Sequence, residues 1–371
     1  MRERRFDYTM FALVVILLTI GVIMIYSASA FTALKEGQSS QFYFWKQLMW
    51  FVLAIFTTLI VSRINYHHWE KLAWPILLIS LILLVAVFTQ REVNGARRWI
   101  FVFNQSLQPS EAFKYALIIF TSYYLCRRRE MLSKLKALAW PWGAFAALGM
   151  GLILLQPDLG MVLVIMMTIF VLLFMAGLKY RYVLVGILAP AILATFMVFA
   201  LHYKSARLQA FLHPETATLA EAYHQNQSLM AIGSGGLYGV GIGRGIAKLF
   251  HLPESHTDFI IANVAEEGGF ILILLCLGLY FIIVIRGLRV ASLAPDHFGF
   301  YLAFGIVSIL TISIIINISV AVRLIPTTGM TLPFLSYGGS SLLCSSFGIG
   351  VLLNISRHQC KVSKLFDKRK S

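Results

Sequence analysis

The chain contains a succession of apolar runs, each about as long as a lipid bilayer is thick. A helix of about 20 mainly apolar residues crosses the hydrocarbon core, and a backbone inside lipid has to satisfy its own hydrogen bonds. Hydrophobic residues make up 59% of the 371 residues and charged residues only 13%, whereas soluble domains carry about 25% charged residues. The runs therefore predict an all-α polytopic membrane protein.

We expect ten transmembrane helices, which places both termini on the same side of the membrane. The basic N-terminus and Ala28-Ser29-Ala30 resemble a signal peptide. However, the apolar run from Thr9 to Tyr26 exceeds the length of a signal core, so we expect it to remain as the first helix. Residues 1–371 are expected to form a single transmembrane domain. The ten helices are expected at 9–30, 44–62, 71–89, 111–126, 138–156, 160–178, 182–202, 258–286, 299–321 and 336–356.

Basic residues orient these helices. The segments on one side of the expected bundle hold 20 of the 31 Lys and Arg but only six of the 16 Asp and Glu. Short basic connections face the cytoplasm, so we expect this side, with both termini, to be cytoplasmic. The net charge of +15 also suggests nucleic acid, but no basic stretch is interleaved with aromatic residues in a soluble module. We therefore expect no nucleic-acid partner.

Three connections on the opposite side are longer than the cytoplasmic ones. They span residues 31–43, 90–110 and 203–257, and the last joins the seventh and eighth expected helices. Loops of such length are usually functional or disordered. Because residues 203–257 include aromatic and apolar side chains, we expect a large, ordered extracytoplasmic loop with a function.

Two carboxylates begin helices at this outer edge. Glu111 and Lys114 are three residues apart at the start of the fourth expected helix and share one helix face. They are interpreted either as a first-turn charge with an internal ion pair or as a polar pair that lines a cavity. Asp158 follows Gln156-Pro157 and is interpreted first as a helix N-cap in a tight turn, which still places its carboxylate at the outer surface.

Acidic residues also crowd the start of the eighth expected helix. Thr257 or Asp258 suits an N-cap, although a cap does not explain the neighbouring Glu254 and His256. Glu266 and Glu267 lie about two turns, or ~12 Å, further along. A buried pair of glutamates is costly, so we expect at least one of them to face a cavity or a cation.

Two further segments depart from regular helix. Residues 233–245 contain seven glycines in thirteen residues. They predict either a flexible linker or a re-entrant segment whose bare backbone approaches a ligand, with Arg244 and Lys248 near a phosphate. Residues 324–341 are apolar but contain two prolines and three glycines, so we expect a broken segment that lines protein or water on the outer side.

Carboxylates and cations thus converge on the outer edge of the membrane, where they suit the polar headgroup of a lipid. A carboxylate among apolar helices can serve as a general base, and two or three carboxylates can hold Mg²⁺ or Mn²⁺ against a pyrophosphate. A transporter or a flippase can use the same groups, so the residues alone leave the reaction open.

The chain resembles the SEDS family (shape, elongation, division and sporulation), the FtsW, RodA and SpoVE type of peptidoglycan glycosyltransferases. The matching motifs run nearly from end to end and are specific as a set. They are Tyr26-Ser27-Ala28-Ser29, Asn94-Gly95-Ala96-Arg97-Arg98-Trp99, Gln108-Pro109-Ser110-Glu111 with Lys114, Gln156-Pro157-Asp158, Gly233-Ser234-Gly235-Gly236-Leu237, Leu252-Pro253-Glu254-Ser255-His256-Thr257-Asp258-Phe259-Ile260 and Leu335-Ser336-Tyr337-Gly338-Gly339-Ser340-Ser341.

The resemblance implies polymerisation of lipid II into β-1,4 glycan strands, with inversion at the anomeric carbon, at the outer face of the bacterial cytoplasmic membrane. Asp258 matches the family's essential aspartate and is the expected base, with metal coordination as a competing role. Glu111, Lys114 and Asp158 match other polar cavity positions, and Glu111 and Asp158 are the other candidate ligands for Mg²⁺ or Mn²⁺. Lys114 and Arg207 are expected to neutralise the pyrophosphate, Arg207 on its position alone, and Lys248 to meet phosphate. Trp99 is expected either to stack on a sugar face or to anchor the chain at the membrane interface, and His256 is a further expected substrate contact.

The resemblance also implies partners. Family members work with a class B penicillin-binding protein, a transpeptidase, among the membrane proteins of the divisome or elongasome. The stretch 241–248 is more similar to FtsW or SpoVE than to RodA, which favours a division-type enzyme. Two alternatives stay open: a lipid II flippase, for which Glu266 and Glu267 are the relevant groups, and a non-catalytic scaffold for the transpeptidase.

Overall fold

The computed structural model describes residues 6–35, 37–93, 95–102, 105–128, 139–178, 219–246 and 257–358, with the isolated residues 188, 192 and 211. The described chain is mostly helical, as the apolar runs predict. The expected helix at 182–202 lies outside the described residues, so the count of ten spans stays a prediction.

Most of the expected helices form within a few residues of their predicted bounds. They are α1 (Tyr8–Lys35), α2 (Phe42–Val61), α4 (Ala73–Ala86) with the short 3₁₀ turn η1 (Val87–Thr89), α5 (Pro109–Arg127), α7 (Ala144–Leu155) after the π-helical turn η3 (Ala139–Gly143), α8 (Leu159–Met175), α13 (Ile260–Ser292), α14 (His297–Ala321) and α15 (Gly339–Arg357).

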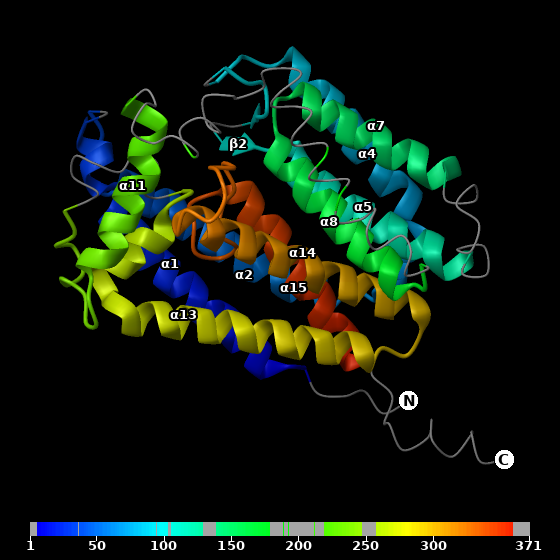
Figure 1. Ribbon diagram of the computed structural model, residues 1–371. Coiled ribbons are helices and arrows are strands. Elements are labelled where there is room, and N and C mark those ends of the chain that lie inside the picture. The colour runs from blue at the N-terminus through cyan, green and yellow to red at the C-terminus, as the bar shows by residue number, and fades with distance from the viewer. Residues whose placement is uncertain are drawn as a thin grey trace.

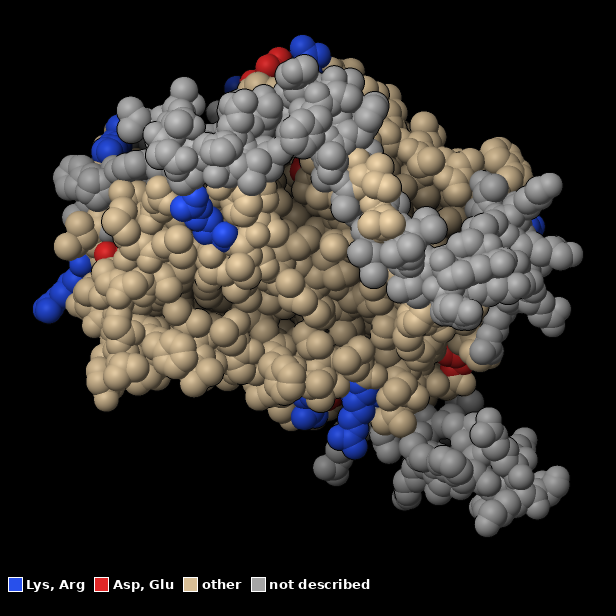
Figure 2. All heavy atoms as spheres, viewed as in Figure 1, with Lys and Arg blue, Asp and Glu red and all other residues tan. Residues whose placement is uncertain are grey.

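Length and composition make this a multi-pass membrane protein. Among the described residues, five helices are long and apolar enough to cross a membrane: α1, α2, α13, α14 and α15. Large hydrophobic side chains are exposed along their outer faces, for example Phe56, Phe281 and Ile315, as expected where lipid is the solvent. Figure 2 shows uncharged residues across the middle of the visible face, with Lys, Arg, Asp and Glu mostly toward its upper and lower edges.

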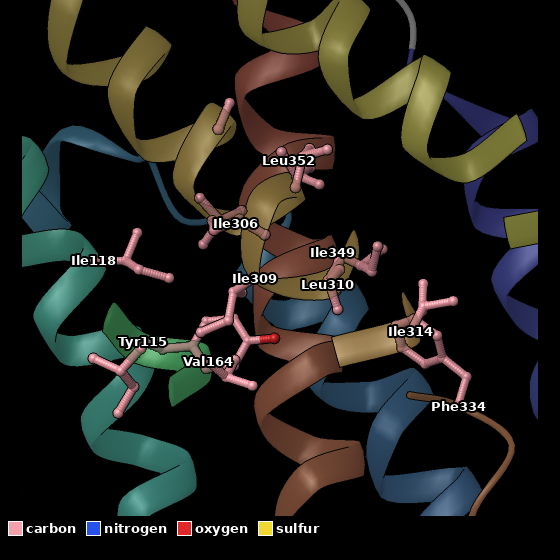
Figure 3. Close-up of a cluster of buried hydrophobic side chains, with 14 of the residues drawn as sticks. Tyr115, Ile118, Val164, Ile306, Ile309, Leu310, Ile314, Phe334, Ile349 and Leu352 are labelled. Atoms are coloured by element: carbon pink, nitrogen blue, oxygen red, sulfur yellow. The ribbon is translucent and has the colours of Figure 1, made fainter. Parts of the chain in front are cut away.

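Helix α14 lies at the centre of the packed core. It contacts α13, α5, α8 and α15, and α15 in turn packs along α2. Figure 1 shows α14 and α15 between α1, α2 and α13 on one side and α4, α5, α7 and α8 on the other. Side chains from these helices meet at buried positions such as Ile118, Ile306 and Ile349 (Figure 3). The helices whose ends carry the polar residues of the candidate site are packed together through this core.

Both ends of the described chain meet at one end of the bundle. The Arg357 guanidinium lies 4.9 Å from the centre of the Phe6 ring, and Arg286 pairs with Asp7 at 2.8 Å. The start of α1 and the end of α15 therefore lie together.

Four features were not anticipated. A helix, α11 (Leu219–Ser234), forms inside the expected outer loop, and a hairpin of β1 (Ile100–Val102) and β2 (Gln105–Leu107) forms in the connection 90–110. A short helix, α3 (His67–Lys71), precedes α4. Helix α13 is also broken at Gly269, where φ is 68° and ψ is −171°. Periodicity predicts only long regular elements, so these short or interrupted ones carry no signal of their own.

Candidate functional site

The broken segment between α14 and α15, residues 322–338, forms the floor of the site. It is not helical, and most of its residues are half-buried or buried, which agrees with the prediction from its prolines and glycines. Its backbone groups bond to side chains of α14 and of the segment itself: Asn317 donates to the Met330 carbonyl at 2.6 Å, and the Leu332 amide donates to the Ser336 hydroxyl at 2.8 Å. Such pairing is what allows irregular backbone to persist at membrane depth.

Asp258 lies directly on this floor. Ser336 Oγ donates to the Thr257 carbonyl at 2.6 Å, and Asn317 Nδ2 donates to the Asp258 carbonyl at 3.1 Å. A Cβ placed on Gly329, whose φ is +78°, would lie 3.8 Å from Asp258 Oδ2. Gly329 is exposed and Asp258 is half-buried, so the carboxylate stands at the rim of the floor, beside the bare backbone of Gly329.

The interpretation of Thr257 or Asp258 as the N-cap of α13 is wrong. The helix begins at Ile260, with Phe259 at the cap position and no side-chain cap bond. The reason lies in contacts with distant segments: the carbonyls of Thr257 and Asp258 accept from Ser336 and Asn317, and the first helical hydrogen bond starts from the Phe259 carbonyl.

Glu111 and Lys114 form a buried ion pair at the start of α5. Lys114 Nζ lies 2.6 Å from Glu111 Oε2, and both side chains are about 95% buried. Pro109 occupies the first turn of the helix, where its missing N–H costs nothing. The predicted pairing is confirmed, and the start of α5 is held to α15 because the Gln108 amide, just before the helix, bonds to Ser340 Oγ at 2.9 Å.

Asp158 is the N-cap of α8, as its turn predicted. Its Oδ1 accepts from the Met161 amide at 3.2 Å, and its Oδ2 accepts from Gln108 Nε2 at 3.2 Å. Gln108 thus joins Asp158 to the helix that carries Glu111. Because Gln108 is also bonded to Ser340, three elements meet at this carboxylate.

Arg98 is the functional candidate that sequence reasoning missed. Its guanidinium donates to the carbonyls of Gln156, at 3.0 Å, and of Pro157, and lies 3.7 Å from Asp158 Oδ2. It closes the C-terminal end of α7 and supplies positive charge beside Asp158. The neighbouring Arg97 makes only an exposed bond to the Phe88 carbonyl, and the Arg97-Arg98 pair contains no signal that separates the two.

A chain of contacts connects the two aspartates through the floor. Gly160, two residues after Asp158, packs so closely on Thr328 that an added Cβ would lie 3.0 Å from the Thr328 carbonyl oxygen. Thr328 precedes Gly329, which borders Asp258. On the other side, Thr331 Oγ1 donates to Ser341 Oγ at 2.9 Å. The starts of α8, α13 and α15 are therefore fixed around one segment.

Two hydroxyls at the site have no hydrogen-bond partner within the described part of the chain. They are Ser110 Oγ, beside Glu111, and Thr328 Oγ1, beside Gly160 and Gly329. Buried hydroxyls are nearly always bonded to protein or ordered water. These two are therefore available to water or to a polar ligand.

Of the other residues predicted to contact the substrate, only Trp99 is among the described residues. Trp99 is half-buried between the bend at 95–98 and β1, and nothing in its surroundings separates sugar stacking from interfacial anchoring. Arg207, Lys248 and His256 lie outside the described residues, so their predicted roles stay predictions.

The three carboxylates expected to share a metal do not form a ready oxygen cage. Within the described residues, no three His, Cys, Asp or Glu side chains gather in a way that suits a metal ion. Glu111 is paired with Lys114, and Asp158 is bonded to Gln108 and the Met161 amide. Binding of Mg²⁺ or Mn²⁺ by these carboxylates would require Glu111 and Asp158 to exchange these contacts for the metal, so the shared metal stays a prediction.

Glu266 and Glu267 are buried and meet the glycine-rich segment. The Ile246 amide donates to Glu266 Oε1 at 2.7 Å, and the Gly243 amide donates to Glu267 Oε2 at 2.9 Å. The glycine-rich segment is therefore not a flexible linker. Its bare backbone approaches helix α13 closely, while Arg244 is exposed.

Comparison with known proteins identifies the family. A family model described as "Cell cycle protein", for the FtsW, RodA and SpoVE proteins, matches residues 8–361. The chain belongs to the FtsW/RodA/SpoVE family. The resemblance inferred from the motifs is thereby confirmed, and family membership together with the apolar helices makes this a multi-pass protein of the bacterial inner membrane.

Relatives match along nearly the whole chain. The probable peptidoglycan glycosyltransferase FtsW of Trichlorobacter lovleyi is 38% identical over 358 residues, which cover 96% of this chain and 94% of the relative. The stage V sporulation protein E of Bacillus subtilis is 37% identical over 363 residues, covering 95% and 97%.

Solved structures share the fold. The Rod shape determining protein RodA of Thermus thermophilus superposes with a TM-score of 0.71 at 28% identity, covering 96% of this chain and 98% of RodA. A chain from a structure described as "Structural coordination of polymerization and crosslinking by a peptidoglycan synthase complex" gives a TM-score of 0.79 at 28% identity, covering 95% and 98%.

Proposed function

We propose that this protein is a peptidoglycan glycosyltransferase that polymerises lipid II into β-1,4 glycan strands. The observation that carries the proposal is the position of Asp258, a half-buried residue whose carboxylate lies beside Gly329 at the rim of the broken segment. Relatives 38% identical over nearly their full length bear the name probable peptidoglycan glycosyltransferase FtsW, which supports the same reaction.

The chemistry follows as a single displacement. The Asp258 carboxylate takes the proton from the 4-hydroxyl of an acceptor GlcNAc, whose oxygen attacks the anomeric carbon of a MurNAc linked to lipid pyrophosphate. The bond between that carbon and the pyrophosphate oxygen breaks, so the linkage inverts from α to β and the lipid pyrophosphate leaves. One base within hydrogen-bond reach of the acceptor hydroxyl suffices for this step.

Positive charge near the leaving group is the second requirement. An ammonium has three donors, and the Lys114 ammonium directs one of them to Glu111 at 2.6 Å, which leaves two for a pyrophosphate oxygen. Arg207 and Lys248 are proposed to contact the same group, with Trp99 and His256 against the sugars. Mg²⁺ or Mn²⁺ bound to pyrophosphate would supply further charge neutralisation.

The proposed membrane topology has ten spans, both termini in the cytoplasm and the large loop at about 203–257 outside. The distribution of Lys and Arg supports it, as does the contact between Phe6 and Arg357, which puts the two described ends together. The site with Asp258, Asp158 and Glu111 then faces outward, where lipid II presents its headgroup.

The proposed partner is a class B penicillin-binding protein. Support comes from the structural neighbour that belongs to a peptidoglycan synthase complex. A role in division, with other membrane proteins of the divisome, is proposed over elongation because the relatives with 38% identity are named FtsW.

The test is polymerisation by the purified protein together with its transpeptidase partner. Lipid II and Mg²⁺ or Mn²⁺ are supplied, and glycan polymer is resolved on a gel; the proposal expects polymer. Lipid II that crosses the bilayer of proteoliposomes without polymer formation would instead establish a flippase. If a folded complex shows neither polymerisation nor transport of lipid II, the result would establish a scaffold.

A further inference from the structure

Helix α13 exchanges its own hydrogen bonds for bonds to another segment at its break. In a regular helix the amides of Phe270 and Ile271 bond to the carbonyls of Glu266 and Glu267. Here these amides donate to Gly236 and Leu237, at 2.9 and 3.2 Å. The two released carbonyls accept instead from the glycine-rich segment, as the amides of Val240 and Gly241 bond to Glu266 and Glu267 at 2.9 and 3.1 Å.

We call this arrangement the glycine clasp: residues 235–246 folded onto residues 265–271 of α13. It depends on backbone-to-backbone approach, since a Cβ on Gly239 would overlap the Glu267 carbonyl and one on Gly235 would overlap the Ala265 carbonyl. Gly269 supplies the positive φ of 68° that turns the helix aside, a conformation that other residues adopt only with strain.

The two glutamate side chains complete the glycine clasp. Each carboxylate accepts from a backbone amide of the glycine-rich segment, Glu266 from Ile246 and Glu267 from Gly243. Ser27 of α1 adds a bond of 2.7 Å to Glu267. These contacts tie the glycine-rich segment and α1 to the break.

The break separates the part of α13 next to Asp258 from the rest of the helix. Residues 260–268 form a short outer portion, and Asp258 stands two residues before it. Because the helical hydrogen bonds across Gly269 are missing, the direction of the outer portion depends on the glycine clasp rather than on helix continuity. If the clasp opens, the amides of Phe270 and Ile271 can return to Glu266 and Glu267, which straightens the helix and swings the outer portion.

We propose that Glu266 and Glu267 are positioning residues. Through the glycine clasp they hold the outer portion of α13 in its broken arrangement and so set where the Asp258 carboxylate stands over the floor. The catalytic consequence rests on the proposed function; the conformational part does not.

Hydrogen exchange followed by mass spectrometry tests the conformational part without substrate. The chain is placed in lipid nanodiscs as wild type, Glu267→Ala, Gly269→Ala and, as a control on an exposed outer carboxylate, Glu92→Ala. We expect faster exchange of the Val240 and Gly241 amides in Glu267→Ala and Gly269→Ala. The amides of Phe270 and Ile271 should stay protected, because helical hydrogen bonds replace their bonds to the glycine-rich segment. Exchange at Val240 and Gly241 identical to wild type in Gly269→Ala would overturn the proposal. If Glu267→Ala does not fold, the exchange of the Val240 and Gly241 amides in Gly269→Ala and Ser27→Ala tests the proposal instead.

Polymerisation kinetics then test positioning. A displaced base lowers kcat by ~10- to 100-fold, while KM for lipid II changes by less than about twofold because binding groups are untouched. We expect this split for Glu267→Ala, and recovery to within about threefold in Glu267→Gln, whose amide oxygen still accepts one bond. If hydrogen exchange shows that the glycine clasp has opened in a variant and its kcat still equals that of wild type, the positioning role is overturned. Absence of polymer from wild type would refute the proposed function instead, and leave the exchange result to stand.

Discussion

The Arg98 guanidinium lies 3.7 Å from the Asp158 carboxylate and at the same time donates to the carbonyls of the two preceding residues, Gln156 and Pro157. One side chain from the 90–108 connection therefore fixes both the end of α7 and the start of α8. Asp158 is held by this arginine on one side and by Gln108 on the other. The 90–108 connection thus has a structural role at the site, through Arg98 and Gln108.

Replacement of Arg98 should destabilise the protein measurably. Arg98→Ala removes charge-assisted bonds to two carbonyls in a side chain that is 17% exposed, and we expect a loss of about 2–3 kcal/mol in the free energy of unfolding. Arg97→Ala is the matched control, since its single bond is exposed, and should change stability by less than about 0.5 kcal/mol. Thermal unfolding in detergent measures both, and equal midpoints would contradict the role assigned to Arg98.

The buried pair of Glu111 and Lys114 permits stability to be separated from chemistry. Glu111→Gln or Lys114→Met alone leaves one charge buried without its partner, which costs about 3–5 kcal/mol. The double variant should be more stable than either single one because no charge remains. If Lys114 also serves the pyrophosphate, the double variant regains stability but makes no polymer. Polymer from the double variant at the wild-type rate would remove Lys114 from the reaction.

Gly329 should be intolerant of a side chain for a reason that is specific to the site. Gly329→Ala has strain at φ +78° of about 1–3 kcal/mol and places a methyl group 3.8 Å from Asp258 Oδ2, where the acceptor hydroxyl must come. Gly37→Ala is the control, with φ +71° and nothing within 4 Å. We expect similar thermal shifts in both but loss of polymerisation only at Gly329. Equal activities would show that the space beside Asp258 is not needed.

Two glycines on α7 test the packing that supports the site. Gly149 faces Phe113 of α5 so closely that an added Cβ would overlap its ring, whereas Gly151 has open space. Gly149→Ala should cost about 1–3 kcal/mol through overpacking, while Gly151→Ala should be neutral or stabilise by up to about 1 kcal/mol. Unfolding midpoints in the reverse order would show that α7 does not seat on α5 as described.

Much of the fold followed from the sequence because lipid imposes a simple rule. A run of about 20 apolar residues forms a helix whatever its neighbours, so the predicted 299–321 became α14 at His297–Ala321 and the predicted 44–62 became α2 at Phe42–Val61. The break at 324–341 followed equally from two prolines. Asp258 and the Glu111–Lys114 pair were identified from motifs and spacing.

The remaining features depend on contacts between distant segments, which no local pattern encodes. Arg98 and Arg97 are chemically identical neighbours, and only the fold brings one of them to the turn at Gln156. The start of α13 moved to Ile260 because Asn317 and Ser336 take the carbonyls before it. Glu267 and Gly243 are 24 residues apart, yet their bond defines the glycine clasp.

Asp258 is proposed as the base of glycan polymerisation, and a single substitution at this residue tests that role. Asp258→Asn keeps the shape of the side chain but cannot accept the proton. The variant is purified with the transpeptidase partner and given lipid II and divalent cation, alongside wild type, with thermal unfolding as the check on folding. We predict a folded protein, with a midpoint close to that of wild type, that makes no glycan polymer. Full polymerisation by Asp258→Asn would contradict the account.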